Sequence, residues 1–281
     1  MPMYGRGWAV RVVTALLAGA AVPVVTAGAA QAAVSGMDRV ETEVTVPANT
    51  SYVVPMTCRS SGWTAVSGGW HIESSNHVKS LVIRQSRPSS GGGWTFIFSN
   101  TASVGQQLFA RITCVRDLVD PLSVTSGNVS IPSGSTASAV ATCPRGTRAL
   151  GGGFSVNGFG HNQVVPLWSA PLVAQHGWVG HFRNNGVATT VTTYGVCGKV
   201  VNHYLEISTA TVSPGEERKV YASPCTQEYV VSGGGWQHSF TAHSPLRNAI
   251  HYTDRVWRNT VTNSSSGSIQ IATYAVCIRL A

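Results

Sequence analysis

The sequence predicts an all-β protein in which one disulfide-bonded unit occurs three times. Six cysteines form two series: the leading cysteines lie 85 and 82 residues apart, and the closing cysteines lie 83 and 80 residues apart. Before the closing cysteines, apolar and polar side chains alternate with the period of two that is typical of strands. Glycine accounts for 30 of the 281 residues, which favours a fold rich in turns. Beyond the N-terminal segment, no stretch shows helical periodicity.

Residues 1–33 are typical of a secretory signal peptide. Arg6 and Arg11 precede an apolar run from Val12 to Val22, and Ala30-Gln31-Ala32 has the small-x-small pattern of a cleavage site. The apolar run is too short to span a bilayer, and no later segment is apolar enough to do so. We therefore expect cleavage after residue 32 or 33 and a secreted, extracellular protein without a transmembrane anchor.

The cysteine spacing divides the rest of the chain into three β modules, residues 34–118, 119–202 and 203–281, here called copies one, two and three. Each copy has one leading and one closing cysteine, 56, 54 and 52 residues apart. An oxidising compartment favours disulfides, and the repeat reduces the fifteen possible pairings to one consistent set. The predicted bonds are Cys58–Cys114, Cys143–Cys197 and Cys225–Cys277.

Four further features keep the same register in every copy. A run of glycines stands before an aromatic residue: Gly68-Gly69-Trp70, Gly151-Gly152-Gly153-Phe154 and Gly233-Gly234-Gly235-Trp236. Glycines in a strand permit a bulge or the close approach of a ring or another backbone, so we expect the aromatic residue to pack inward. Downstream lie three histidines (His77, His161, His243), three tryptophans (Trp94, Trp178, Trp257) and three asparagines (Asn100, Asn184, Asn263).

Two arrangements of the copies are compatible with the repeat. We expect three tandem disulfide-pinned β-sandwich-like modules, because each copy has its own disulfide. The alternative is one pseudo-threefold β-prism-like body. The cysteine–aromatic–cysteine spacing is similar to that of immunoglobulin domains. However, Tyr194 and Tyr274 lie three residues before the closing cysteine instead of two, which argues against a true immunoglobulin domain.

Copies two and three also resemble a known module. CPRGTRALGGGF (143–154), GlyTrp at 177–178, Asn184 and the strand ending TYGVC are similar to a repeat of secreted actinobacterial proteins with the pattern C-P-x-G, G-G-G, G-W and Y-A-V-C. The resemblance covers most of residues 40–281. Copy one lacks the C-P pair and the tyrosine, and copy three has CTQ instead. The resemblance implies secretion and a common fold, but no activity.

The distribution of acidic residues argues against an enzyme built from each copy. No Asp or Glu occurs from Pro121 to Leu205, so copy two cannot perform paired-carboxylate glycoside hydrolysis or form a carboxylate-rich calcium site. The cysteines are all paired and lack the close spacing of zinc ligands. His251 and Asp254 leave a Ser–His–Asp set open, although G-x-S-x-G is missing. We expect no cofactor and no metal.

These observations predict a non-catalytic protein with an extracellular binding or structural role. The candidate binding residues are the recurrent Trp, His and Asn, because aromatic rings and amides recognise sugars, and the expected partner is a polysaccharide or cell-envelope surface. The competing interpretations are core tryptophans, turn-forming asparagines and histidines that bond local backbone; in a closed body the histidines could also converge on a metal. Scattered basic residues, with a net charge of +6 after the signal peptide, do not predict nucleic-acid binding. The alternative function is a secreted hydrolase with a single site between modules.

Overall fold

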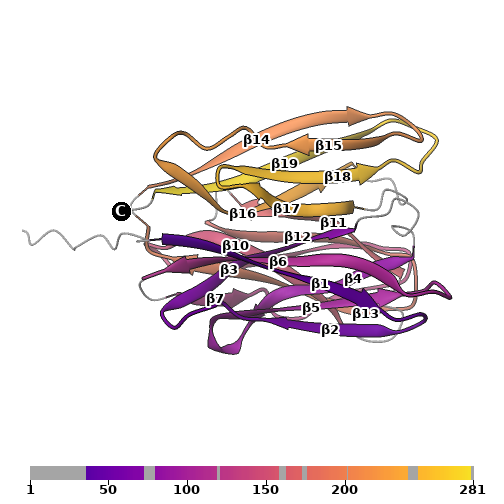
Figure 1. Cartoon of the computed structure of the whole chain (residues 1–281). Helices are drawn as coiled ribbons and strands as arrows, with labels where there is room; N and C mark the ends of the chain where they lie inside the picture. Colours follow the sequence, from indigo (N-terminus) through magenta and orange to yellow (C-terminus); the bar gives the residue numbers. More distant parts are fainter. Residues whose placement is uncertain are drawn as a thin grey trace, which may run out of the picture. The chain divides into compact units, whose positions relative to one another are not determined.

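The structure is a computed structural model that describes residues 36–72, 80–118, 121–157, 163–172, 176–200, 202–239 and 246–279. The signal peptide predicted for residues 1–33 lies outside this part of the chain. The described residues belong to one compact unit, Gln31–Ala281, and form strands joined by turns (Figure 1). The all-β class expected from the alternating pattern is confirmed.

The strands form three antiparallel sheets (Figure 1). In order across the sheet, the first contains β1 (Gly36–Val46), β6 (Gln106–Arg116), β3 (Trp63–Ile72), β17 (Leu246–Thr253), β18 (Val256–Thr262) and β15 (Glu217–Tyr221). The second contains β2 (Ser51–Met56), β5 (Gly93–Asn100), β4 (Leu81–Ser89), β10 (Arg148–Asn157), β13 (Thr189–Gly198) and β7 (Leu122–Thr125), with β8 (Val129–Ile131) also on β13. The third contains β14 (His203–Val212), β19 (Ile269–Arg279), β16 (Tyr229–His238), β11 (Val164–Leu172), β12 (Gly177–Asn184) and β9 (Thr136–Thr142).

Every sheet is assembled from two copies. Copies one and three share the first sheet, copies one and two the second, and copies two and three the third. The copies pair through β3–β17, β10–β4 and β16–β11. This is the pseudo-threefold alternative, and it corrects the expectation of three separate sandwich-like modules. The physical reason is that each copy divides into two halves, and each half completes its sheet with strands of a neighbouring copy.

The three predicted disulfides are confirmed. Cys58–Cys114, Cys143–Cys197 and Cys225–Cys277 have Cα–Cα distances of 5.9, 5.7 and 5.8 Å. The leading cysteines follow β2, β9 and β15, whereas the closing cysteines lie in β6, β13 and β19, so each bond joins the two halves of one copy and thereby two sheets. Three such bonds indicate an oxidising compartment.

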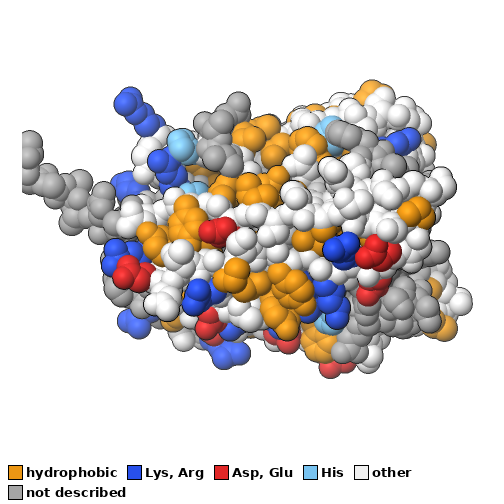
Figure 2. Space-filling view, turned by 90° about the horizontal axis from the view of Figure 1, so that it is seen from above, with side chains coloured by type: hydrophobic (Ala, Val, Ile, Leu, Met, Phe, Trp, Pro, Cys, Tyr) orange, Lys and Arg blue, Asp and Glu red, His pale blue; other side chains and the backbone are white. Residues whose placement is uncertain are grey.

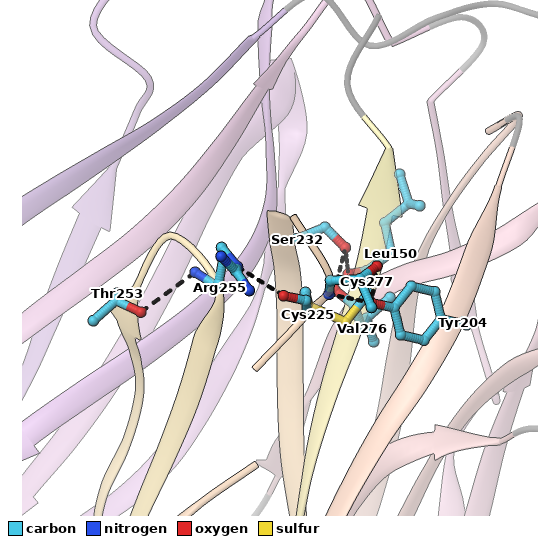
Figure 3. Close-up of a disulfide and its surroundings, with 9 residues drawn as sticks. Leu150, Tyr204, Cys225, Ser232, Thr253, Arg255, Val276 and Cys277 are labelled. Carbon is cyan, nitrogen blue, oxygen red and sulfur yellow. Dashed lines mark hydrogen bonds between the residues drawn. A yellow bond between two sulfur atoms is a disulfide. The ribbon is translucent and has the colours of Figure 1, made fainter. Parts of the chain in front are cut away.

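A hydrogen bond between copies two and three lies close to the third disulfide (Figure 3). The Ser232 hydroxyl of copy three donates to the Leu150 carbonyl of copy two over 2.8 Å. Ser67 of copy one donates in turn to the Ser232 carbonyl, also over 2.8 Å. These buried bonds connect β3, β10 and β16, the central strands of the three sheets, and therefore fix the copies against one another.

The second-to-last glycine of each run lies directly against a tryptophan ring. A Cβ atom on Gly152 would lie 2.4 Å from the Trp178 ring, closer than any real contact allows. The aromatic residues that follow the glycine runs also pack inward: Trp70 meets Trp236 edge-on at 5.5 Å, and Phe154 meets Trp236 at 6.2 Å. The same contact recurs at Gly68 with Trp94 and at Gly234 with Trp257.

The last glycine of each run allows two copies to pair. A Cβ atom on Gly153 would lie 1.8 Å from the Ser86 carbonyl oxygen, where β10 of copy two meets β4 of copy one. The first glycine is crowded by another copy as well, since a Cβ on Gly151 would lie 2.2 Å from the Val66 carbonyl oxygen. The expected close approach of a ring and a backbone is therefore confirmed. The last-glycine contact recurs at Gly69 with Ala249 and at Gly235 with Ser169.

Candidate functional site

The recurrent tryptophans lie in the core of the body. Trp94, Trp178 and Trp257 are at most 1% exposed. Their indole nitrogens donate to buried oxygens of Ser86, Ser169 and Asn259. Each ring fills the space above a glycine, which explains why tryptophan recurs at this position. No indole face of the three is available to a ligand at the surface.

The recurrent asparagines hold turns together. The Asn184 side chain is fully buried; it donates to the carbonyls of Ile131 and Val187 and accepts from the Gly186 amide. Asn100 and Asn263 make the corresponding bonds in copies one and three. The amide therefore closes a loop at the end of β5, β12 or β18, and its polar atoms are already satisfied by the chain.

The predicted surface of tryptophan, asparagine and histidine is not assembled by the described residues. Its tryptophans and asparagines are buried for the reasons given above, as the core and turn interpretations required. His77, His161 and His243, with the proposed convergence on a metal, lie outside the described residues. Elsewhere in the described chain, no three His, Cys, Asp or Glu side chains are grouped so that they could hold a metal ion.

His251 and Asp254 take part in separate interactions, one in the core and one at the surface. The His251 ring is 1% exposed and contacts the Thr113 hydroxyl through Nδ1 at 3.1 Å. Burial, followed by the positive charge of Arg39, lowers the pKa of His251 to about 3. The Asp254 carboxylate forms an ion pair with Arg39. The neutral imidazole is thus part of the core, and the carboxylate serves a surface ion pair.

A groove of about 480 Å³ opens where the chain passes from copy one to copy two. Its walls come from the start of β3, the turn η2 (Ser90–Gly92) between β4 and β5, and the segment that leads into β7. The first and second sheets thus meet at this groove. It is lined by Gly62, Trp63, Thr64, Ala65, Pro88, Ser89, Gly91, Gly92, Gly93, Leu118, Pro121, Ser123 and Val196.

The lining of this groove, here called the Trp63 groove, is uncharged among the described residues. The half-buried Trp63 indole is its one aromatic ring, and Thr64, Ser89 and Ser123 bring hydroxyls that can donate and accept hydrogen bonds. Gly91 and Gly92 both have φ of +74°, a conformation that favours glycine, so these two residues of the η2 turn present backbone without side chains. Such a surface suits a neutral, polyhydroxylated ligand.

Among the described residues, the indole of the Trp63 groove is not repeated in the other copies. The position of Trp63 is occupied by Tyr229 in copy three, and that ring packs edge-on against Tyr204 at 4.8 Å. In copy two it is occupied by Thr147, whose hydroxyl donates to the Pro144 carbonyl. Beside Trp63 stands Gly36, which offers no side chain to cover the ring. The pseudo-threefold repeat is therefore broken at this site.

A second aromatic surface crosses the third sheet and is here called the Trp168 row. The half-buried Trp168 ring lies 5.0 Å from the His181 ring and pairs in register with Gln237. The Tyr274 hydroxyl donates to Gln237 Oε1 over 2.7 Å, and the Ser138 hydroxyl contacts His181 Nδ1 at the same distance. Burial lowers the pKa of His181, so this row is uncharged at neutral pH.

Comparisons with known proteins add no family to these observations. A scan against models of protein families finds no match, and a search of curated proteins finds no similar sequence. No helix of membrane-spanning length and hydrophobicity occurs in the part of the chain that the structure describes.

Sequence reasoning missed both aromatic surfaces because it followed the positions that recur. The residues that recur in all three copies lie in the core, because each copy packs its core in the same way. Trp63 and Trp168 occur once each, and only an alignment of the three copies that looked for departures at half-exposed positions could have found them.

Proposed function

We propose that the protein is a secreted, non-catalytic binding protein that holds a neutral sugar unit of a polysaccharide or cell-envelope polymer in the Trp63 groove. The observation that carries the proposal is a groove whose described lining residues are uncharged and include one half-buried indole and several hydroxyls, at a place where the repeat is broken. The signal-peptide pattern of residues 1–33 and the three disulfides support an extracellular location.

The chemistry of the groove fits a sugar ring. The apolar C–H face of a pyranose can pack on the indole of Trp63, which supplies a large, rigid contact area. Ring hydroxyls can then bond with Thr64, Ser89 and Ser123 and with the exposed backbone of the η2 turn. The rigid, disulfide-bonded body keeps these groups in place, so little conformational entropy is lost on binding.

Replacing Trp63 with alanine is expected to weaken polysaccharide binding at least tenfold, because aromatic anchors contribute about 2 kcal/mol or more at binding sites. The measurement is calorimetry with residues 34–281 on soluble neutral glycans, after a retention screen on cellulose, chitin, mannan and β-glucan. Trp63→Phe keeps an aromatic face and is expected to retain part of the affinity.

Trp168→Ala is the matched control, since it removes a half-buried indole from the Trp168 row. It is expected to leave the affinity within about twofold of the unaltered chain. The opposite pattern, loss with Trp168→Ala and none with Trp63→Ala, would move the site to the third sheet and contradict the proposal. Failure of the unaltered chain to bind any of the glycans would also contradict it.

A further inference from the structure

The Arg258 side chain on β18 is a nearly buried charge. It is 9% exposed, and its Nε atom is fully buried without a hydrogen-bond partner among the described residues. None of the ion pairs within the described chain includes Arg258. A buried charge normally has a partner of opposite sign, because its desolvation is otherwise costly. Among the residues that the structure describes, the guanidinium group therefore has no anionic partner.

Two exposed tyrosines stand beside this arginine. Tyr221 is 40% exposed and is the register partner of Arg258 on the neighbouring strand β15. Tyr252, at the end of β17, is 45% exposed, and its ring meets the Tyr221 ring at 5.3 Å with an angle of 67°. The Arg258 guanidinium lies 4.7 Å from the centre of the Tyr252 ring. The ring thus holds the cation in place, and aromatic surface remains open around it.

The fold does not require a charge at this position. In the other copies the residue after the recurrent tryptophan is Thr95 or Val179, and their register partners are Pro55 and Val140. Only the first sheet has arginine and tyrosine there. As at Trp63, the three copies differ at a position where a side chain can contact a ligand. On the face shown in Figure 2, hydrophobic side chains form several separate groups among uncharged polar side chains and backbone, with a few basic and acidic side chains between them.

We propose that Arg258, Tyr252 and Tyr221 form a second binding site, which accepts a carboxylate or phosphate group carried on a sugar or polyol. The guanidinium group offers paired N–H donors to the two oxygens of such an anion, and this charge-assisted contact is stronger than a neutral one. The tyrosine rings contact the apolar part of the sugar or polyol, and their hydroxyls can donate hydrogen bonds. This site differs from the Trp63 groove in place and in ligand charge, so it stands independently of the neutral-sugar proposal.

The test uses residues 34–281 and three polymers: polygalacturonate as a carboxylate, poly(glycerol phosphate) as a phosphate carried on a polyol, and dextran as a neutral control. The expected result is binding of at least one anionic polymer at low salt, with Arg258→Gln reducing the affinity at least tenfold. Arg59→Gln removes the same charge from a side chain that is 68% exposed and is expected to change the affinity less than twofold. The two anionic arms show which acid the site prefers.

A readout on the unaltered chain covers the case in which Arg258→Gln fails to fold. The ¹⁵Nε–¹Hε resonance of Arg258 is expected to shift on addition of the anionic polymer, and Tyr252→Ala is expected to weaken binding as well. Equal affinities of Arg258→Gln and the unaltered chain would overturn the proposal. So would an unmoved Arg258 resonance, or an absence of binding to both anionic polymers. Loss of neutral-glycan binding with Trp63→Ala tests a different site and leaves these outcomes unaffected.

Discussion

Replacing Gly153 with alanine is expected to lower the free energy of unfolding by about 3 kcal/mol or more, at the upper end of the range for overpacked interiors. The added methyl group would lie 1.8 Å from the Ser86 carbonyl oxygen. That oxygen belongs to β4 of copy one, and Gly153 to β10 of copy two, so the clash separates the strands that join two copies. The measurement is urea unfolding of residues 34–281 under oxidising conditions.

Gly267→Ala is the matched control. A Cβ atom at Gly267 meets nothing within 4 Å, and its backbone is not left-handed, so we expect a change within about 0.5 kcal/mol. Equal small effects of the two substitutions would show that β10 and β4 do not approach as described. Gly235→Ala, at the junction of copies two and three, is expected to behave like Gly153→Ala, since its Cβ would lie 2.1 Å from the Ser169 carbonyl oxygen.

His251 is expected to make the protein sensitive to acid. The pKa of His251 is about 3 in the folded chain, whereas the ordinary pKa of histidine is 6.5. Between these two pH values, His251 therefore binds a proton in the unfolded chain but not in the folded chain. Stability therefore falls as the pH falls from 6.5, and the loss is complete below pH 3. The contribution of His251 amounts to about 3 kcal/mol between pH 6.5 and pH 4. Burial also lowers the pKa of His238, which acts in the same direction.

The substitution His251→Gln removes the proton that His251 takes up on unfolding in acid. The variant is expected to be less stable at pH 7 but to lose about 3 kcal/mol less between pH 6.5 and pH 4 in urea unfolding. Gly267→Ala, which changes no titratable group and whose added methyl group meets nothing within 4 Å, is the control and should follow the pH profile of the unaltered chain. A pH profile of His251→Gln that runs parallel to that of the unaltered chain would mean that the imidazole is not buried and neutral.

The strands and the disulfides could be predicted from the sequence, but the way in which the three copies assemble into sheets could not. Alternation before Cys114 and Cys277 predicted strands, and the spacing of the cysteines predicted the three bonds, all of which the structure shows. One edge of β10 pairs with β13 of its own copy, and the choice between separate modules and a closed body depends on whether its other edge pairs within copy two or with β4 of copy one. Both choices bury the same residue types, so the hydrophobic pattern cannot distinguish them. The glycine run was the one local signal, because Gly153 leaves room for a backbone from elsewhere.

The candidate site was harder to predict than the fold for a physical reason. Residues that recur in all copies, such as Trp178 and Asn184, solve a packing or turn problem that each copy faces, and they are buried. Residues that can serve a single ligand occur once, and their chemistry depends on neighbours that are distant along the chain. Trp63 lines a groove together with Pro121 and Ser123 of copy two, and Arg258 pairs in register with Tyr221 of its own copy.

The central claim is that the three copies complete one another's sheets, and the most direct test is the expression of copy two alone. Residues 119–202 with the Cys143–Cys197 bond contain β10 and β13 of the second sheet and β11, β12 and β9 of the third, without their partners from copies one and three. We expect this fragment to show no cooperative unfolding as a monomer, and to gain structure only by assembling with further copies. A folded monomer with a sharp urea transition and native near-ultraviolet circular dichroism would contradict the account.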